Sequence, residues 1–331
     1  MKSSSQLFPV SLLRADVLGD LTEDVYLVKH NRDPDRSVQV AVSHTGLRSR
    51  ATNGQPVVLL HGSFSNRGFW LSEKGEGLAR HLLELGFDVW MMEMRGHGLS
   101  PRNHDYLHNT LERYVLADIP AVNDFVLEKT GKKPVWIGHS LGGVIVASAV
   151  AAGYLRDENC AGMGLLGAQA IRRPLYQWIP FAGPVLRTVV RSKGELDGRK
   201  MGIGPENEPM GLINEYLARH GWFGSWQLKS TRQKLLPAWK AGTSLPLLAV
   251  AAAADQSDPA KACLKFAALY GGEQKEQILA GKKDGFSRDY GHVDMVVSKD
   301  AAVEIWPRIS QWLGQIGAPA ADAPAVVPSS N

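Results

Sequence analysis

Residues 135–143, Val-Trp-Ile-Gly-His-Ser-Leu-Gly-Gly, constrain the fold of this chain more than any other stretch. A run of β-forming residues leads into G-x-S-x-G, and a small-residue helix pattern at 144–149 follows, which is typical of a strand, a sharp turn and a helix. The turn strains the serine backbone, and side chains at Gly138 or Gly142 would collide with the neighbouring strand and helix. The pattern predicts that Ser140 is an exposed nucleophile, which needs a base and an oxyanion site elsewhere.

Short apolar runs alternate with longer helical patterns along the chain. This alternation predicts an α/β fold with a mostly parallel central sheet and helices on both faces. The expected strands cover residues 39–42, 56–60, 88–92, 135–137, 162–166 and 245–250. Apolar residues at helical spacing indicate helices at 78–85 and 111–128, and a last helix that begins near Ala301.

Composition divides the chain into four expected parts. These are an N-terminal extension (1–20), an α/β core in two pieces (21–167 and 243–313), a helical cap (168–242) inserted before the acid-bearing strand, and a disordered tail (314–331). The tail is rich in Ala and Pro and cannot bury enough apolar surface to offset the cost of ordering. The N-terminus lacks the apolar core of a secretion signal, and no window approaches the ~18 apolar residues of a membrane span. We therefore expect a cytoplasmic protein.

The expected cap differs from the rest of the chain in composition. It holds four of the nine tryptophans, and twelve Arg and Lys against five Asp and Glu. Because it is expected over the strand ends, it should shape the substrate pocket, for which the candidate residues are Phe64, His139, Trp178, Phe181, Trp222 and Phe223. The alternative is that the cap aromatics form a small core of their own. The basic excess is interpreted as a solvated face, with peripheral docking on an anionic membrane as the alternative.

The partners of the serine are expected in the chain order nucleophile, acid, histidine. Asp255 follows a long apolar run, at the strand end where sites form in open α/β sheets. It is preferred over Asp258, which precedes Pro259 and is interpreted as the start of a helix. His292 lies after a glycine in a loop before the last helix and is predicted to be the general base. Asp294 lies too close along the chain to be its usual partner.

Two backbone amides are predicted to bind the oxyanion. One belongs to Leu141, at the start of a helix whose dipole favours negative charge. The other is expected in the His-Gly-Ser-Phe loop after strand 56–60, with Ser63 preferred over Phe64. His61 is predicted to hold this loop. The two cysteines are far apart and form no metal-type spacing, so no metal is expected. Acyl transfer by a serine, a histidine and an acid needs no cofactor, so none is expected.

The elbow, the His-Gly loop and the terminal Gly-His resemble the α/β-hydrolase superfamily. Its acid lipase branch (gastric and lysosomal lipases) is also similar in several stretches, namely Thr22-Glu23-Asp24, 86–90, Arg95-Gly96, 118–121, 124–125, 129–131, and Asp255 followed by Asp258-Pro259. Leu141 stands where that branch usually has glutamine. Residues 95–98, Arg-Gly-His-Gly, look more like monoacylglycerol lipases and bacterial esterases. The resemblance covers residues 21–313 apart from the cap.

These patterns predict a serine-dependent carboxylic-ester hydrolase (an esterase or lipase) that acts on medium- or long-chain acyl esters through an acyl-enzyme. The alternatives are an acyltransferase or thioesterase with the same triad, and a non-catalytic lipid-binding protein on the same fold. The expected partner is a small-molecule ester. A formal net charge of only +4 gives no reason to expect nucleic acid. The oligomeric state stays open.

Overall fold

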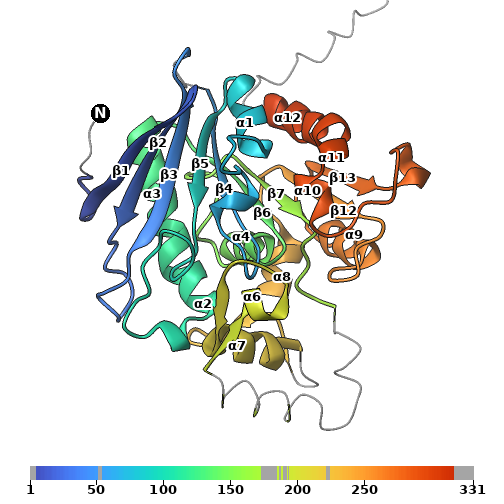
Figure 1. The fold of residues 1–331 in the computed structure, drawn as a ribbon. Helices are drawn as coiled ribbons and strands as arrows, with labels where there is room; N and C mark the ends of the chain where they lie inside the picture. The colour runs from blue at the N-terminus through green and yellow to red at the C-terminus, as the bar shows by residue number, and fades with distance from the viewer. Residues whose placement is uncertain are drawn as a thin grey trace, which may run out of the picture.

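The computed structural model describes residues 5–50, 54–172, 194–220 and 224–316, with isolated helical positions at 185, 188 and 192. Its centre is a nine-stranded sheet in the order β1-β2-β3-β5-β4-β6-β7-β12-β13 (Figure 1). The strands are β1 (Val10–Leu18), β2 (Leu21–Val28), β3 (Val40–Leu47), β4 (Pro56–Leu60), β5 (Asp88–Met92), β6 (Val135–His139), β7 (Gly162–Leu166), β12 (Leu247–Ala252) and β13 (Lys275–Ala280).

The sheet is parallel from β5 to β13, and the first three strands are antiparallel to their neighbours. Strands β4 to β7 are five-residue runs in which every residue is buried, as expected where helices cover both faces. Successive side chains enter opposite core layers, so Val57 and Leu59 lie in one layer and Val58 and Leu60 in the other.

Helices cover both faces of this sheet. One layer is packed by α1 (Leu78–Glu84), α10 (Asp294–Val297), α11 (Lys299–Glu304) and α12 (Trp306–Gln315). The opposite layer is packed by α3 (Ile119–Thr130), α4 (Leu141–Ala151), α8 (Leu235–Ala241) and α9 (Ala260–Ala268). Short 3-10 turns are η1 (Arg67–Phe69), η2 (Tyr106–His108) and η5 (Lys282–Asp284). The predicted α/β architecture is confirmed.

The N-terminal boundary of the core is earlier than predicted. Residues 10–18, which we assigned to an extension, form β1, an edge strand that pairs with β2. Strand β2 was also missing from the expected set. The register shifts between Leu12 and Arg14, which marks a bulge. Most of β1 is exposed, so its sequence lacks the apolar alternation that identifies a half-buried strand.

Two expected helices are interrupted. The helix predicted over 111–128 consists of α2 (Leu111–Arg113), a π-helical turn η3 (Tyr114–Asp118), and α3, which carries a proline in its first turn. The last helix is split into α11 and α12, and α12 again has a proline near its start. Both prolines lie where one helical segment passes into the next, and a proline supplies no backbone N–H to an uninterrupted α-helix.

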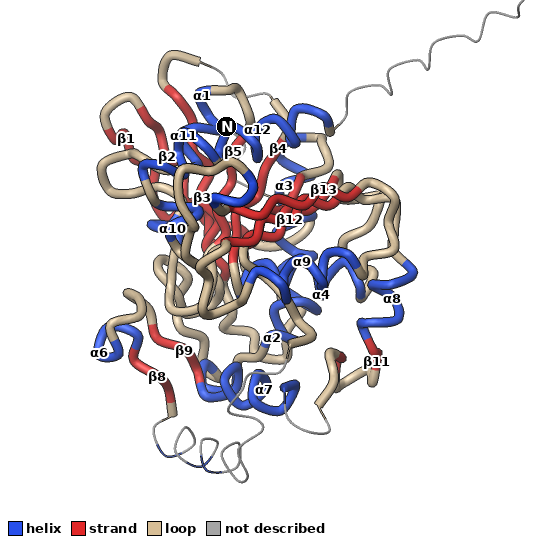
Figure 2. The backbone as a smooth tube through the Cα atoms, turned by 90° about the vertical axis from the view of Figure 1, so that its right-hand side faces the viewer, coloured by secondary structure: helices blue, strands red, loops and turns tan. Residues whose placement is uncertain are grey.

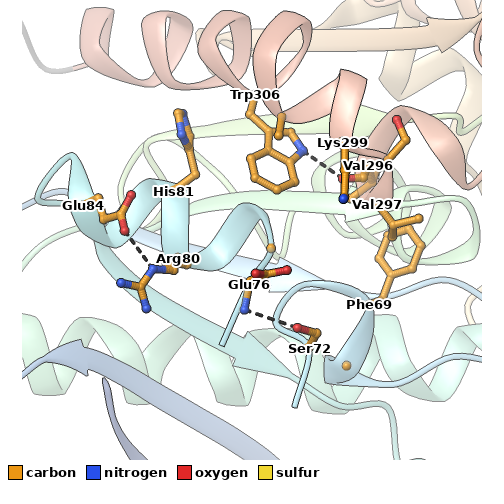
Figure 3. Close-up of a pocket in the computed structure, with 14 residues that line it drawn as sticks. Phe69, Ser72, Glu76, Arg80, His81, Glu84, Val296, Val297, Lys299 and Trp306 are labelled. Carbon is orange, nitrogen blue, oxygen red and sulfur yellow. Dashed lines mark hydrogen bonds and ion pairs between the residues drawn. The ribbon is translucent and has the colours of Figure 1, made fainter. Parts of the chain in front are cut away.

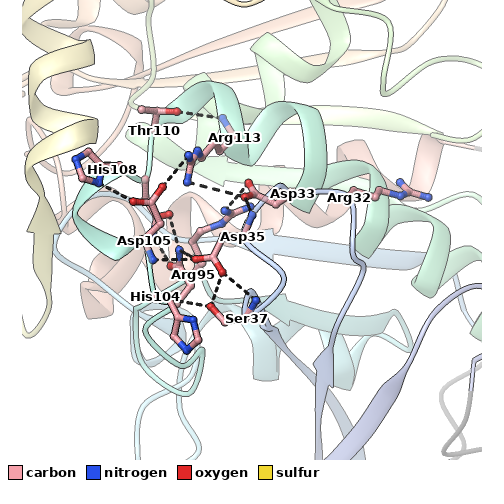
Figure 4. Close-up of polar contacts among 12 residues, drawn as sticks. Arg32, Asp33, Asp35, Ser37, Arg95, His104, Asp105, His108, Thr110 and Arg113 are labelled. Carbon is pink, nitrogen blue, oxygen red and sulfur yellow. Dashed lines mark hydrogen bonds and ion pairs between the residues drawn. The ribbon is translucent and has the colours of Figure 1, made fainter.

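A buried polar network fixes the loop that follows β5 (Figure 4). The Arg95 guanidinium is fully buried and donates hydrogen bonds to Asp33 and Asp118. Burial alone would raise the pKa of the Asp118 carboxyl, but Arg95 and His30 outweigh burial and lower it. Arg113 pairs with Asp105 at 2.9 Å on the other side of the network. The loop is therefore anchored both to the β2–β3 connection and to the helix that follows it.

The segment predicted as a helical cap contains two small antiparallel pairs besides its helices. They are β8 (Glu195–Asp197) with β9 (Asn207–Pro209), and β10 (Gln227–Leu228) with β11 (Gln233–Lys234). The described helices of this segment, besides α8, are α6 (Gly198–Met201) and α7 (Met210–His220). Figure 2 shows α6, β8, β9 and α7 grouped at one end of the molecule, away from the sheet. Strands of two or three residues carry too little alternation to be predicted from sequence.

The second piece of the core begins earlier than the predicted residue 243. Trp226 donates a hydrogen bond from Nε1 to Ser148 Oγ of α4 at 2.9 Å. Trp239 stacks on Phe266 with ring centroids 4.8 Å apart. These two tryptophans therefore pack in the core rather than over a pocket. They join the core of the sheet domain and do not form a separate small core within the cap.

Candidate active site

The predicted strand, turn and helix around Ser140 are present. Strand β6 ends at His139, and Ser140 has φ 51° and ψ −120°, a region that side chains rarely occupy. A Cβ on Gly138 would lie 2.5 Å from the backbone of Gly142 and of Gly143. A Cβ on Gly142 would collide with the carbonyl oxygens of Leu60 and His61. The serine is therefore held at the strand end by close backbone packing that only glycine allows.

Substitution of Gly138 by alanine is expected to destabilise the fold by about 3 kcal/mol, because the clash is with backbone and cannot be relieved by a rotamer change. Gly314 in α12 is the matched control, since a Cβ there meets nothing within 4 Å. Gly314→Ala should be neutral or stabilise by up to about 1 kcal/mol. Urea unfolding of both variants measures the difference. Equal stability of the two would contradict the packing argument.

Asp255 and His292 are brought together at the carboxyl end of the sheet. Asp255 lies just after β12, is buried, and its Oδ2 is 2.6 Å from His292 Nδ1. Its Oδ1 accepts hydrogen bonds from the amides of Ser257 and Asp258, at 2.8 and 2.9 Å. These bonds leave Oδ2 directed at the imidazole. His292 Nε2 is then the nitrogen available to a nucleophile.

The two other candidate carboxylates have different partners. Asp258 Oδ1 accepts a hydrogen bond from Gln169 Nε2 at 2.8 Å, and burial raises the pKa of this carboxyl. Asp294 accepts from the Gly291 amide and pairs with Arg288 at 3.2 Å. Within the described residues, neither carboxylate hydrogen bonds to the His292 imidazole.

His139, which the sequence indicated as a packing or pocket-floor residue, is buried. Its Nε2–H donates to the backbone carbonyl of His292 at 2.9 Å, and the two rings lie 4.6 Å apart. Its other face stacks on Phe69, with centroids 4.5 Å apart. Burial and the neighbouring His292 lower the pKa of His139 to about 3, so it is neutral. His139 therefore ties the histidine loop to the elbow. The structure shows no hydrogen bond between Ser140 Oγ and His292 among the described residues.

Sequence reasoning missed Gly167, which lies just after β7. Its φ is 56°, and a Cβ there would lie 2.7 Å from Met295 Cε and 3.2 Å from His292 Nδ1. The absence of a side chain lets the histidine loop approach the end of β7. A glycine directly after the strand next to the elbow strand was the signal that could have identified this position.

The loop with the predicted second oxyanion donor lies against the elbow. A Cβ on Gly62 would be 3.0 Å from both His139 Nδ1 and Ser140 Cβ. His61 Nε2 accepts a hydrogen bond from the Met94 amide at 3.1 Å, so its Nδ1 carries the proton and donates to the Gly62 carbonyl at 2.8 Å. Burial and the nearby His97 lower the pKa of His61 to about 3. This neutral histidine fixes the peptide that precedes Ser63.

The amides of Ser63 and Leu141 donate no hydrogen bond within the described part of the chain. Leu141 follows Ser140 at the first position of α4, and Ser63 follows Gly62, which closely approaches Ser140. Both amides therefore stay candidates for the oxyanion site that the sequence predicts.

Four of the candidate pocket residues, Trp178, Phe181, Trp222 and Phe223, lie outside the described residues. A cavity of about 450 Å³ lies between α1 and α10–α11 (Figure 3). Phe69 lines it from one side and Trp306 from the other, with Arg80, Glu84 and Lys299 around them. Ser140, Asp255 and His292 are not in its wall.

The structure and the comparisons with known proteins agree on the class of fold. The chain has the α/β-hydrolase fold, as the resemblance implied, and a family model described as "alpha/beta hydrolase fold" matches residues 55–198. It is similar to a tear acid lipase-like protein of Mesocricetus auratus, 34% identical over 139 residues, which is 39% of this chain and 33% of that protein. Human gastric triacylglycerol lipase is 33% identical over 136 residues, 38% of this chain and 32% of the lipase. The match thus spans about a third of each relative.

Solved structures agree with this fold over most of the chain. A thermophilic esterase from Thermogutta terrifontis superposes with a TM-score of 0.60 at 18% identity, covering 89% of this chain and 99% of the esterase. A monoacylglycerol lipase from Paleococcus ferrophilus has a TM-score of 0.54 at 17% identity, covering 78% of this chain and 95% of that chain. Because the sequence identities are this low, these structural likenesses establish the fold alone.

The described residues hold no cluster of three or more His, Cys, Asp or Glu that could bind a metal ion. None of their helices combines the length and the apolar composition that a bilayer-spanning segment requires.

Proposed function

We propose that this protein is a serine-dependent carboxylic-ester hydrolase, with Ser140, Asp255 and His292 as its catalytic residues. The observation that carries the proposal is the 2.6 Å contact of Asp255 with His292, in the loop that His139 ties to the strained serine elbow. Similarity to lipases over about a third of their length supports the same class of reaction.

The proposed reaction has two halves. Ser140 Oγ attacks the ester carbonyl carbon while His292 Nε2 takes its proton, and Asp255 stabilises the imidazolium that forms. The Ser63 and Leu141 amides bind the developing oxyanion. Collapse of the intermediate releases the alcohol, which takes the proton from His292, and leaves an acyl-serine. Water, activated by the same histidine, then hydrolyses this ester and restores the enzyme.

The proposed substrates are esters of medium- or long-chain acids. A panel of nitrophenyl esters from acetate to decanoate tests this assignment, with kcat/KM measured for each. We expect the octanoate to exceed the acetate by about tenfold or more, since each buried methylene contributes about 0.8 kcal/mol. A preference for acetate would contradict the chain-length assignment and leave the esterase assignment standing.

The same acyl-enzyme would also serve an acyltransferase or a thioesterase, in which an alcohol replaces water or a thioester replaces the ester. Product analysis with added alcohol, and assays with a coenzyme A thioester, separate these reactions from hydrolysis. The cytoplasmic location and the solvated basic face stay predictions.

A further inference from the structure

The loop after β4 contains a second strained residue besides the serine. Phe64 has φ 59°, the left-handed region that favours glycine. Both of its backbone groups are bound by residues of the cap segment. The Phe64 amide donates to Glu208 Oε1 at 2.8 Å, and its carbonyl accepts from the Glu206 amide at 3.1 Å. A residue next to the predicted oxyanion donor is thus held from more than 140 positions away in the chain.

Packing reinforces these bonds. Asn66 Nδ2 donates to Glu206 Oε1 at 2.6 Å. A Cβ on Gly204 would collide with the Phe64 carbonyl, and one on Gly198 would lie 3.0 Å from Phe64 Cδ1. The turn between β8 and β9 is therefore fitted closely around Phe64. We call residues 198–208 the clamp.

Glu208 is the buried end of this clamp. Its side chain is fully buried, and Oε1 also lies 3.3 Å from His97 Nε2. His97 is equally buried, and its Nδ1 is 3.3 Å from the Arg95 carbonyl. Burial alone would lower the pKa of His97, but the Glu208 carboxylate outweighs burial and raises it. The Arg95 network anchors this loop, so Glu208 joins the cap to a rigid part of the core.

The position of the Ser63 amide follows from these contacts. In a trans peptide the C=O of Gly62 and the N–H of Ser63 point in opposite directions. His61 Nδ1–H holds the Gly62 carbonyl on one side of this peptide, and Glu208 holds the Phe64 amide on the other. Because the Gly62 carbonyl and the Phe64 amide are both held, the orientation of the Ser63 N–H is fixed. Without Glu208, relaxation of the strained Phe64 would rotate the Ser63–Phe64 unit.

We propose that Glu208 is a positioning residue for the oxyanion site, so that the cap segment completes the site through the backbone of Phe64. This inference rests on the proposed esterase function, because it concerns binding of the same oxyanion. In this role, Glu208 affects the stability of the transition state, which carries the oxyanion, and has little effect on the binding of the substrate.

The test uses the full chain with Glu208→Ala and Glu208→Gln. Glutamine keeps an oxygen that accepts from the Phe64 amide, whereas alanine removes the acceptor. Removal of one oxyanion donor lowers kcat by about 10²–10³-fold. Misplacement of the donor in Glu208→Ala is therefore expected to lower kcat by about 10- to 100-fold. KM should change by less than about threefold. Affinity for a trifluoromethyl ketone, whose adduct carries the oxyanion, should fall by the same factor. Glu208→Gln should recover most of the kcat.

Glu195→Gln is the matched control, because Glu195 lies on the partner strand β8 and pairs with the half-exposed Arg102 at 2.9 Å. It should leave kcat unchanged. All kcat values are divided by the concentration of active sites, titrated with a fluorophosphonate. A role limited to stability would lower the titrated fraction and leave kcat per site unchanged, which would overturn the proposal. A loss confined to KM, or equal kcat in the alanine variant and the wild type, would also overturn it.

Failure of the proposed esterase function can be distinguished from failure of the Glu208 positioning role. If the wild type hydrolyses esters and Ser140→Ala does not, the esterase function stands, and an unaffected Glu208→Ala refutes the positioning role alone. If Ser140→Ala retains the wild-type rate, the triad assignment is wrong and the positioning role fails with it.

Discussion

Ester hydrolysis is expected to fall by about 10⁴-fold or more in kcat when Ser140 is replaced by alanine, because triad members act as a unit and no acyl-enzyme can form without the hydroxyl. The fall should be similar for every ester in the panel, since the lost step is common to all of them. Nitrophenyl release under saturating substrate measures it. A fluorophosphonate should add to the wild-type peptide that contains Ser140 and to no peptide of the variant.

Ser11→Ala is the control for this experiment, because Ser11 lies exposed on β1. It should hydrolyse esters and accept the label like the wild type. Activity that survives in Ser140→Ala would refute the nucleophile assignment, and a label on a different serine would identify the residue that replaces it.

A second large effect is expected at the acid. Asp255→Asn should lower kcat by about 10⁴-fold, because an amide opposite His292 Nδ1 stabilises the wrong tautomer. KM should change little, since Asp255 is buried behind the histidine. Thermal unfolding of the variant shows whether the fold is intact. A loss below about tenfold would mean that the 2.6 Å contact is not part of the catalytic machinery.

Asp258→Asn is the natural comparison, because Asp258 lies three residues further along the same loop. Its carboxylate accepts from Gln169 and not from His292, so we expect less than about a tenfold loss of kcat. The two variants change the same charge in the same neighbourhood. If Asp258→Asn caused the larger loss, the assignment of the acid would be reversed.

The parallel strands and the order of the site residues could be predicted because both depend on local patterns. Five-residue apolar runs between helical stretches are long enough to identify β4 to β7. Asp255 was found from the rule that sites form at the carboxyl ends of parallel strands. Strand β1 could not be found in this way, since its exposed side chains follow no apolar alternation.

Apart from Gly167, the contacts that support the site depend on tertiary structure and have no local signal in the sequence. Glu208 reaches Phe64 across 144 positions, from a strand of three residues. His139 was interpreted as a packing or pocket residue, because a lone histidine in a motif does not show that its ring reaches the His292 carbonyl. Sequence patterns thus indicate the proposed reacting groups, whereas the contacts that orient them are visible only in the structure.

The edge position of β1 affects how this protein behaves at high concentration. An edge strand presents unpaired N–H and C=O groups, and β1 adds exposed apolar side chains at Leu12, Leu13 and Val17. Such an edge can recruit a strand from another molecule and start aggregation. The bulge after Leu12 interrupts the regular row of hydrogen-bonding groups, and Arg14, paired with Asp16 at 3.0 Å, places charge at its centre. These two features protect the exposed end of the sheet against self-association.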